Sequence, residues 1–442
     1  MCYNGLENRN FAIASSYANA FGRIFKVSKL EKQVKYSKKI VDKYFETDSV
    51  DNQKIVGLTI ESIYKYSAED FDNVATILMP LIYIAKHGSE ESVSSIFQDI
   101  WVESSKSGSS SLNLCFPEII DLVNVHMKSN IFSIRKTCAV ALCDACKVYS
   151  GVLDAKKIEK VFNILLEACS SRSWDGKEFV VSGVINSFKK FSVQASLDEK
   201  VGNKIDKMLQ IELSKKNRSY VKKLIQPFTE YVFFRNDEKL YEKLTHVIEE
   251  AFNELEIEDD KEDRDDSRGH SKKPKLVEDV HKSSSQENID KENFKIGIIK
   301  SVAKELHEMV HKENGIKYED VLRLVYSFMK GMFENSSIEY TWRSQLAYFE
   351  TAITLISPLD VNFLTSHNAS DIFIDMWKYG YDLCKTKEII ESVKIKCIRY
   401  GGLLKAKLPD TNIMVNFDIS ELLRVDHSSV LKAEAVKIGI SP

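Results

Sequence analysis

The sequence predicts an all-α protein, and within that class a HEAT/armadillo-type solenoid of stacked antiparallel helix pairs. Apolar residues recur every three or four positions, as in Ile134, Cys138, Ala141, Leu142 and Ala145, which is the spacing of one face of a helix. Only 17 Gly and 7 Pro occur in 442 residues, which is too few for the frequent turns of an all-β fold. The predicted helices also come in pairs that repeat along the chain.

The repeat is clearest in the second helix of each pair. The midpoints of these helices are 42, 42, 42, 44 and 41 residues apart, and a two-helix unit of about 40–47 residues is typical of HEAT and armadillo repeats. The predicted second helices are Asn10–Phe25, Asp51–Tyr66, Glu91–Glu103, Ile131–Tyr149, Asp175–Phe191 and Ser219–Phe234. The predicted first helices are Lys35–Phe45, Val74–Lys86, Phe116–Lys128, Lys156–Cys169 and Val201–Lys215.

Composition divides the chain into three parts. Residues 1–255 form an array of about six repeats, of which the first is incomplete. Residues 256–293 begin with eight acidic residues in eleven, and such dense charge with few apolar residues predicts a disordered loop. Residues 294–442 return to a helical pattern with less regular spacing. The helices predicted there are Lys295–His311, Tyr318–Phe333, Tyr340–Ile356, Ser370–Cys384, Lys387–Leu404 and a last piece from Asp418.

The first predicted helix has the pattern of the second helix of a pair, and no first helix precedes it in the sequence. Phe11, Ile13 and Tyr17 lie on its apolar face. A solenoid end without a polar cap exposes its core face. We therefore expect the sequence to be the C-terminal portion of a longer array or an incomplete gene product.

Charge and composition exclude several kinds of partner. The net charge of −3 provides no general attraction to nucleic acid. The longest apolar stretch, Val74–Ala85, is shorter than the roughly 20 residues of a membrane span. Eight scattered cysteines indicate reduced thiols in an intracellular protein. We expect no nucleic-acid partner, no membrane insertion and a location in the cytoplasm and nucleus. Lys272-Lys273-Pro274-Lys275 resembles a short nuclear import signal, although such clusters are also common in charged linkers.

One motif suggests an enzyme. His307-Glu308-Met309-Val310-His311 fits H-E-x-x-H, in which two histidines one helical turn apart bind Zn²⁺ and the glutamate is the general base. A third protein ligand is still needed, and nothing singles out Glu334 or Glu339 for that role. The same residues also fit an ordinary amphipathic helix. A zinc hydrolase is therefore the minor alternative, and we assign no catalytic, cofactor-binding or metal-binding residue.

Two further short motifs have structural explanations. Cys143-Asp144-Ala145-Cys146 is a lone CxxC in a strongly helical stretch, without the βαβ context of a redox site or a second pair for zinc, so both cysteines are expected to be buried between helices. Gly176-Lys177 lacks the preceding glycine pattern of a phosphate-binding loop. No cofactor and no small-molecule substrate are expected.

The segment from Arg172 to Glu178 reads Arg-Ser-Trp-Asp-Gly-Lys-Glu. Asp175 is placed to cap the next helix, with Glu178 completing a capping box and with Trp174 and Phe179 forming a hydrophobic staple. This segment resembles the proteasome adapter and scaffold protein family, whose members are very long HEAT-repeat proteins. The stretch from Arg9 to Gly22, which includes Ser-Tyr-Ala-Asn-Ala-Phe-Gly, resembles a second helix of an earlier repeat. The order and spacing of the two segments fit the family's C-terminal region.

The resemblance implies a non-catalytic adapter that bridges the core and regulatory particles of the 26S proteasome, with a role in protein quality control. It transfers no catalytic residue and no contact residue, so the protein-binding residues are not assigned. A nuclear transport receptor or another HEAT adapter is the main alternative, because the repeat architecture is shared.

Overall fold

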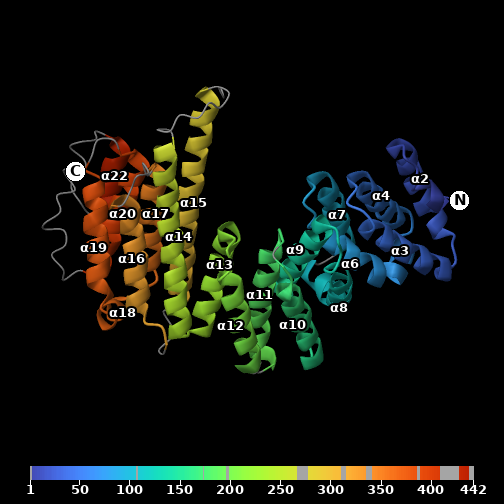
Figure 1. Ribbon diagram of the computed structural model, residues 1–442, viewed down its shortest axis with the longest axis horizontal. Coiled ribbons are helices and arrows are strands. Elements are labelled where there is room, and N and C mark those ends of the chain that lie inside the picture. Colours follow the sequence, from blue (N-terminus) through green and yellow to red (C-terminus); the bar gives the residue numbers. More distant parts are fainter. Residues whose placement is uncertain are drawn as a thin grey trace. The chain divides into compact units, whose positions relative to one another are not determined.

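The computed structural model describes most of the chain, and every element in the described part is a helix (Figure 1). The described residues are 2–105, 108–172, 174–195, 199–265, 277–309, 315–334, 341–385, 389–408 and 428–437. Within these ranges, no helix has both the length and the apolar composition that crossing a membrane requires. The all-α prediction is confirmed for this part of the chain.

The chain divides into two compact units, which we call unit 1 (Met1–Pro227) and unit 2 (Phe228–Pro442). The division falls inside helix α13 (Arg218–Arg235), upstream of the segment 256–293 that composition suggested as the boundary. Residues just after the division pack within unit 2. The N–H of Ile316, for example, donates a hydrogen bond of 3.1 Å to the side chain of Asn236.

Unit 1 consists of two layers of helices, one of first helices and one of second helices. Within the pairs, α3 packs on α4, α6 on α7, α8 on α9 and α10 on α11, and neighbouring first helices also pack on each other. The second helices are α2 (Phe11–Lys26), α4 (Val50–Tyr66), α7 (Glu91–Ser104), α9 (Phe132–Val148) and α11 (Lys177–Ala195). The first helices are α3 (Leu30–Phe45), α6 (Ala75–Ala85), α8 (Gly108–His126), α10 (Ala155–Ser170) and α12 (Glu199–Leu213). Short helices α1 (Cys2–Gly5), α5 (Ala68–Phe71) and η1 (Asp72–Val74) join them. This is the predicted arrangement of stacked pairs.

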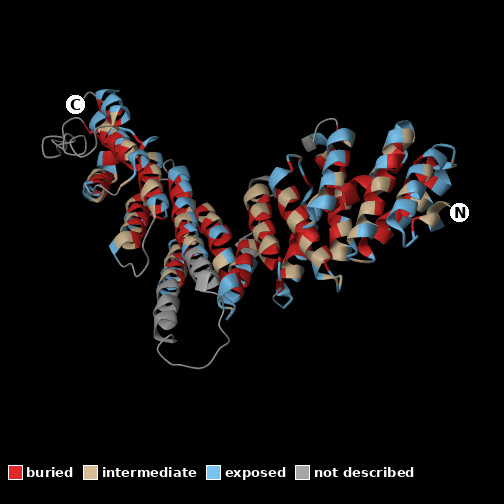
Figure 2. Ribbon diagram, turned by 90° about the horizontal axis from the view of Figure 1, so that it is seen from above, coloured by how far each residue is buried: buried red, intermediate tan, exposed pale blue. Residues whose placement is uncertain are grey.

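Buried residues lie where neighbouring helices meet (Figure 2). Helix α6 is the extreme case, because every residue from Leu78 to Ala85 is buried. It packs against α3, α7, α8 and α9, and a helix that has neighbours on most sides is hydrophobic all round. The longest apolar stretch of the sequence is therefore a core helix of unit 1.

Helices α2 and α4 approach each other closely at Gly22. A Cβ atom added there would lie 2.4 Å from the backbone oxygen of Ser62. The hydroxyl of Ser62 donates to the carbonyl of Asn19, and the hydroxyl of Ser67 donates to the carbonyl of Gly22. The absence of a side chain at Gly22 thus allows the backbones to meet and the two hydroxyls to reach across.

Unit 2 packs α15 against α16 and α17, α16 against α19, and α20 against α17, α19 and α22. The bounds of its helices are α14 (Glu238–Asp265), α15 (Val277–Glu308), α16 (Tyr318–Glu334), α17 (Trp342–Ile356), α18 (Val361–Ser366), α19 (Ala369–Leu383), α20 (Glu391–Lys407) and α22 (Ser429–Lys437). The short helix α18 was not expected. Helix α14 joins this unit through Phe252, whose ring centroid lies 5.0 Å from that of Phe328.

Helical structure extends into both ends of segment 256–293, since α14 runs to Asp265 and α15 begins at Val277. Glu and Lys are good helix formers, so a highly charged sequence can prolong a helix that an amphipathic stretch has begun. Residues 266–276, which include Lys272–Lys275, lie outside the described residues. The disorder of the segment and the domain boundaries based on it stay predictions.

Glu292, near the end of that segment, is buried and holds the start of α17. Its carboxylate accepts hydrogen bonds from the N–H and hydroxyl groups of both Thr341 and Ser344. A carboxylate at this position satisfies backbone donors that the first turn of a helix leaves unpaired. The part of α15 that carries Glu292 is therefore integral to unit 2.

Candidate protein-interaction site

The candidate site surrounds the turn between α10 and α11, where the Arg172–Glu178 segment lies. Helix α11 begins at Lys177, and Gly176 just before it has a φ of +102°, a conformation that residues with a Cβ rarely adopt. Trp174 is buried beneath the turn. Its ring nitrogen donates to the hydroxyl of Ser171 at 3.2 Å.

The capping prediction for this turn was only partly right. Glu178 does reach back, but its carboxylate accepts from the N–H of Gly176 at 3.1 Å. The carboxylate of Asp175 forms ion pairs with Lys136 at 2.8 Å and Lys223 at 3.6 Å. Its hydrogen bond to Lys136 lowers the pKa of Asp175. The capping role of Asp175 is wrong because α11 begins at Lys177, so that Gly176 and not Asp175 directly precedes it, and the Asp175 carboxylate pairs with the two lysines instead.

A buried ion pair anchors the start of α11. Lys177 Nζ lies 2.9 Å from Glu212 Oε1 of α12, and neither residue is more than 2% exposed. Lys177 also donates to the carbonyl of Ser171, while Lys215 and the Tyr220 hydroxyl donate to Glu212. Burial lowers the pKa of Lys177. The sequence does not indicate this pair, because the two residues are 35 positions apart and nothing local links them.

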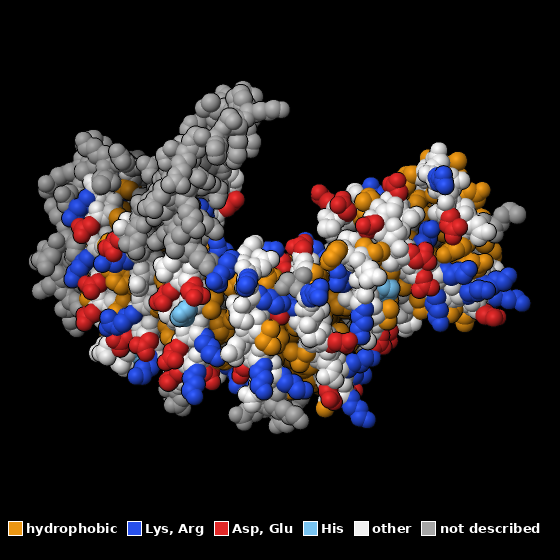
Figure 3. Space-filling view, in the orientation of Figure 1, with side chains coloured by type: hydrophobic (Ala, Val, Ile, Leu, Met, Phe, Trp, Pro, Cys, Tyr) orange, Lys and Arg blue, Asp and Glu red, His pale blue; other side chains and the backbone are white. Residues whose placement is uncertain are grey.

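On the outer side of this pair, α10 and α12 form a groove with a volume of about 600 Å³. We call it the α10–α12 groove. Its lining includes Leu166, Arg172, Lys204, Lys207, Met208 and Ile211. The side chain of Ile211 is 62% exposed. Hydrophobic side chains with Lys and Arg beside them are visible over α10 and α12 in Figure 3.

The cations of this groove differ in their pairing. Lys215 is held by Glu212 at 2.6 Å. Arg172, Lys204 and Lys207 form no ion pair with any side chain that the structure describes. Three basic side chains therefore flank an exposed apolar floor without a carboxylate to neutralise them.

The neighbouring groove, between α8 and α10, has a volume of about 420 Å³, and we call it the α8–α10 groove. It is lined by Asn124, Lys128, Lys156, Glu159, Lys160, Asn163, Ile164 and Glu167. Lys128 pairs with Glu167 at 2.9 Å and Lys160 pairs with Asp121. This groove is polar, and ion pairs between its two helices cross it.

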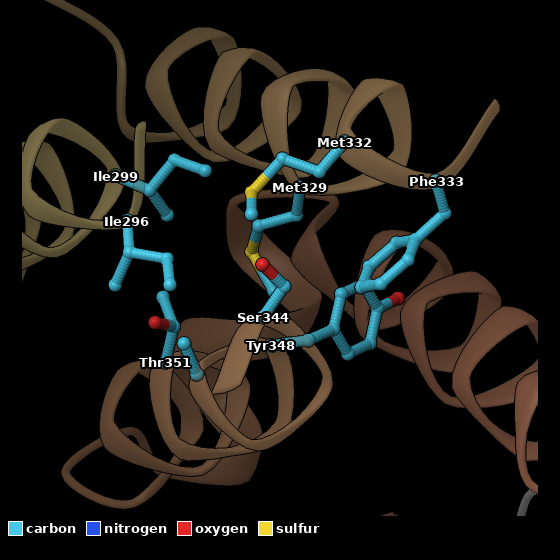
Figure 4. Close-up of a pocket in the computed structure, with 9 residues that line it drawn as sticks. Ile296, Ile299, Met329, Met332, Phe333, Ser344, Tyr348 and Thr351 are labelled. Atoms are coloured by element: carbon cyan, nitrogen blue, oxygen red, sulfur yellow. The ribbon is translucent and has the colours of Figure 1, made fainter. Parts of the chain in front are cut away.

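Unit 2 contains a small enclosed space between α15, α16 and α17 (Figure 4). Its volume is about 10 Å³, enough for one water molecule at most. Thr351 Oγ1 is buried without a hydrogen-bond partner among the described residues, and Met329 and Met332 also line the space. The space is a packing defect rather than a ligand site.

The H-E-x-x-H motif lies only partly within the described residues. His307 and Glu308 are exposed in the last turn of α15, and His311 lies outside the described residues. No group of three His, Cys, Asp or Glu in the described ranges is arranged to hold a metal ion.

The CxxC motif is buried as predicted. Cys143 and Cys146 of α9 face α11, where Ser187 Oγ lies 3.0 Å from Cys146 Sγ. Burial raises the pKa of the Cys146 thiol to about 12, which leaves it protonated and unreactive at neutral pH. Both cysteines are packing residues.

These features define a HEAT/armadillo-type repeat protein whose open surfaces are grooves between helices. A family model described as "Proteasome adapter and scaffold protein ECM29, HEAT-repeat domain" matches residues 1–45, and one described as "ECM29, C-terminal ARM-like repeats" matches residues 190–434. The second match covers more than half of the chain. The chain therefore belongs to the ECM29 family of proteasome adapter and scaffold proteins, as its resemblance at residues 9–22 and 172–178 predicted.

Individual relatives agree. "Proteasome component ECM29" of Saccharomyces cerevisiae is 32% identical over 454 residues, covering 100% of this chain and 24% of that protein. "Proteasome adapter and scaffold protein ECM29" of Homo sapiens is 25% identical over 228 residues, covering 49% of this chain and 12% of that protein. The chain thus spans about a quarter of the length of its yeast relative.

Solved structures add little. Yeast importin-β is 10% identical with a TM-score of 0.41 over 99% of this chain and 56% of that chain. An engineered protein is 8% identical with a TM-score of 0.39 over 99% of this chain and 97% of that chain. Such low scores carry no argument for a transport receptor.

Proposed function

We propose that this chain is a non-catalytic, protein-binding segment of a proteasome adapter, and that it helps to hold the core and regulatory particles of the 26S proteasome together. The observation that carries the proposal is the family match along residues 190–434. It is supported by the identity to the yeast relative along the whole chain.

The architecture suits this role. Repeat proteins present long surfaces of successive helices to large partners. In the described residues the open sites are shallow grooves such as the α8–α10 and α10–α12 grooves, and the enclosed space in unit 2 is too small for a substrate. Many modest contacts along such a surface add up to a firm attachment.

The test uses the full-length protein that contains this segment, tagged and purified from cells. Its co-purification with subunits of both particles is expected, in near-constant proportion. Adding the purified protein to separated core and regulatory particles should increase the amount of the assembled 26S form on native gels. Recovery of one particle alone would overturn the bridging role, and recovery of transport cargo with neither particle would overturn the proposal.

A paired variant tests the absence of catalysis. His307→Ala with His311→Ala should leave proteasome association and metal content unchanged, because the exposed His307 belongs to an ordinary helix on this proposal. Loss of a zinc-dependent hydrolysis in that variant would contradict it. Fluorescent tagging should place the protein in the cytoplasm and nucleus, and a location restricted to other compartments would contradict that part.

A further inference from the structure

The α10–α12 groove has chemistry that the proposed function does not use. Its floor is apolar: Ile211 of α12 is 62% exposed, Leu166 of α10 is partly exposed, and Met208 of α12 is buried. Arg172, Lys204 and Lys207 flank this floor, and none of them forms an ion pair with a described side chain.

The helical spacing gathers these groups on one side of α12. Lys204, Lys207 and Ile211 follow each other at intervals of three and four residues within α12, which places them along one face, and Lys215 lies just beyond the end of the helix. At a rise of about 1.5 Å per residue the row from Lys204 to Ile211 is about 10 Å long. Asp206 lies on the opposite side of α12 by the same geometry, so its charge does not face the groove.

The acidic residue that does line the groove would not repel a negative ligand. Glu212 is 2% exposed, and its carboxylate is already held by Lys177, Lys215 and the hydroxyl of Tyr220. Its negative charge is matched inside the protein. The field at the groove surface therefore comes mainly from Arg172, Lys204 and Lys207.

We propose that the α10–α12 groove is a docking site for an acidic segment of a partner protein that also carries apolar anchor residues. Carboxylates of the segment would pair with Lys204, Lys207 and Arg172, while its apolar side chains would cover Ile211 and Leu166. The length of the row suits about two turns of a helix or about three extended residues. This elongated form favours a peptide over a compact small molecule. The inference goes beyond the proposed function, and it would stand if the partner proved to be a protein other than the proteasome.

The presence of lysines in a groove does not by itself give unpaired basic side chains beside an apolar floor. In the adjacent α8–α10 groove, Lys128 and Lys160 are paired with Glu167 and Asp121, and apolar lining is limited to Ile164. An acidic peptide would have to break existing ion pairs there and would gain little apolar burial. The two grooves therefore offer a matched comparison within one protein.

The experiment selects binders from a random peptide display library on the full chain and then measures the affinity of the enriched peptides. Enriched sequences are expected to combine Asp or Glu with Leu, Ile or Phe. Lys204→Glu with Lys207→Glu should weaken their binding at least tenfold, because two attractions become two repulsions. Ile211→Ser should weaken it severalfold. The control Lys156→Glu with Lys160→Glu makes the same change of net charge on α10 and should alter binding less than twofold.

Several outcomes would overturn the proposal. They are an absence of enrichment over a blank selection, enrichment of peptides that are not acidic, and equal losses in the two charge-reversal variants. Binding that appears only after residues 256–266 are removed would mean that the chain's own acidic stretch occupies the groove. Self-association that the Lys204→Glu, Lys207→Glu variant abolishes would identify a second copy as the occupant instead. Circular dichroism of both variants distinguishes lost binding from lost folding.

Discussion

The α8–α10 and α10–α12 grooves share helix α10 and lie in consecutive repeats, yet their charges are arranged in opposite ways. In the first groove the ion pairs are on the surface, with the paired side chains of Lys128 and Glu167 about 60% exposed. In the second, the ion pair of Lys177 and Glu212 lies beneath the floor, and Arg172, Lys204 and Lys207 form no ion pair with a described side chain. A repeat protein can therefore keep one backbone plan while it changes which gap between helices is open to a partner.

The difference has a physical origin in the turn before α11. Because Gly176 takes a positive φ, the chain enters α11 with Lys177 pointing inward, where it meets Glu212. Because the Glu212 carboxylate is paired with Lys177 inside the protein, it does not neutralise Lys204 or Lys207 on the outer face. The Arg172–Glu178 segment thus determines the buried contact between Lys177 and Glu212. The basic surface of the α10–α12 groove is an indirect result of that contact.

Removing the buried carboxylate should give the largest effect. Glu212→Ala leaves Lys177 and the Tyr220 hydroxyl buried without their partner, and breaking a buried pair in this way costs about 3–5 kcal/mol. Because burial lowers the pKa of Lys177, release of its proton would reduce that cost. Urea denaturation, with hydrogen exchange of α11 and α12 as the local readout, measures the change.

A double replacement is the control for this experiment. Lys177→Met with Glu212→Leu exchanges the pair for apolar residues of similar size and should recover most of the lost stability. If the double variant were as unstable as Glu212→Ala, the loss would be due to packing and the ion-pair explanation would be wrong.

Trp174→Ala should have the next largest effect. The ring is 8% exposed, lines a separate pocket of about 260 Å³ beside the α8–α10 groove, and lies under the guanidinium of Arg135 at 5.2 Å. Truncating a buried tryptophan costs about 3–5 kcal/mol, and we expect the low end because the pocket beside the ring can admit water. Trp174→Phe should retain most of the stability. An unchanged melting curve for Trp174→Ala would contradict the buried placement.

A third, smaller effect on stability is expected from the hydrogen-bonded carboxylate of Asp144, elsewhere in unit 1. The carboxylate of Asp144 lies 3.4 Å from His87 Nε2 and accepts a hydrogen bond of 2.7 Å from the Tyr83 hydroxyl. His87 and then Tyr83 lower the pKa of Asp144 from 3.8 to about 2. A lowered carboxyl pKa stabilises the fold above pH 3.8, and this contribution is lost as the pH falls toward 2.

The carboxylate is 37% exposed, so the effect after solvent screening is on the order of 1 kcal/mol. Comparing the urea midpoints of the wild type and Asp144→Asn from pH 6 to pH 2 separates the contribution of Asp144 from those of other titrating groups. The stability difference between the two proteins should shrink as the pH falls. A constant difference across this range would show that Asp144 does not titrate with the fold.

Sequence periodicity predicted the repeat helices well, because each depends on an apolar stripe that is local in the chain. Helix α9 (Phe132–Val148) lies within one residue at each end of its predicted span. The buried pair of Lys177 and Glu212 could not be predicted, because it joins two repeats and depends on a backbone turn at Gly176. The exposed face of α12 did leave a signal, since Lys204, Lys207 and Ile211 share one side of an amphipathic helix. Burial of Glu292 was missed because its charged neighbours suggested a loop, whereas its partners lie about 50 residues later.

The smallest stability effect is expected from removing the ion pairs of the α8–α10 groove. The same variant is the sharpest test of the comparison between the two grooves. Asp121→Asn with Glu167→Gln removes both carboxylates that hold Lys160 and Lys128. Exposed pairs contribute about 0–1 kcal/mol each, so the melting temperature should hardly change.

The variant then presents unpaired lysines in the α8–α10 groove, as the α10–α12 groove does, but still without an apolar floor. Acidic peptides selected on the wild type should gain no second site by calorimetric titration, because exposed charges without desolvated apolar contacts bind weakly in physiological salt. A second site of similar affinity would show that charge alone distinguishes the grooves and that Ile211 and Leu166 are incidental.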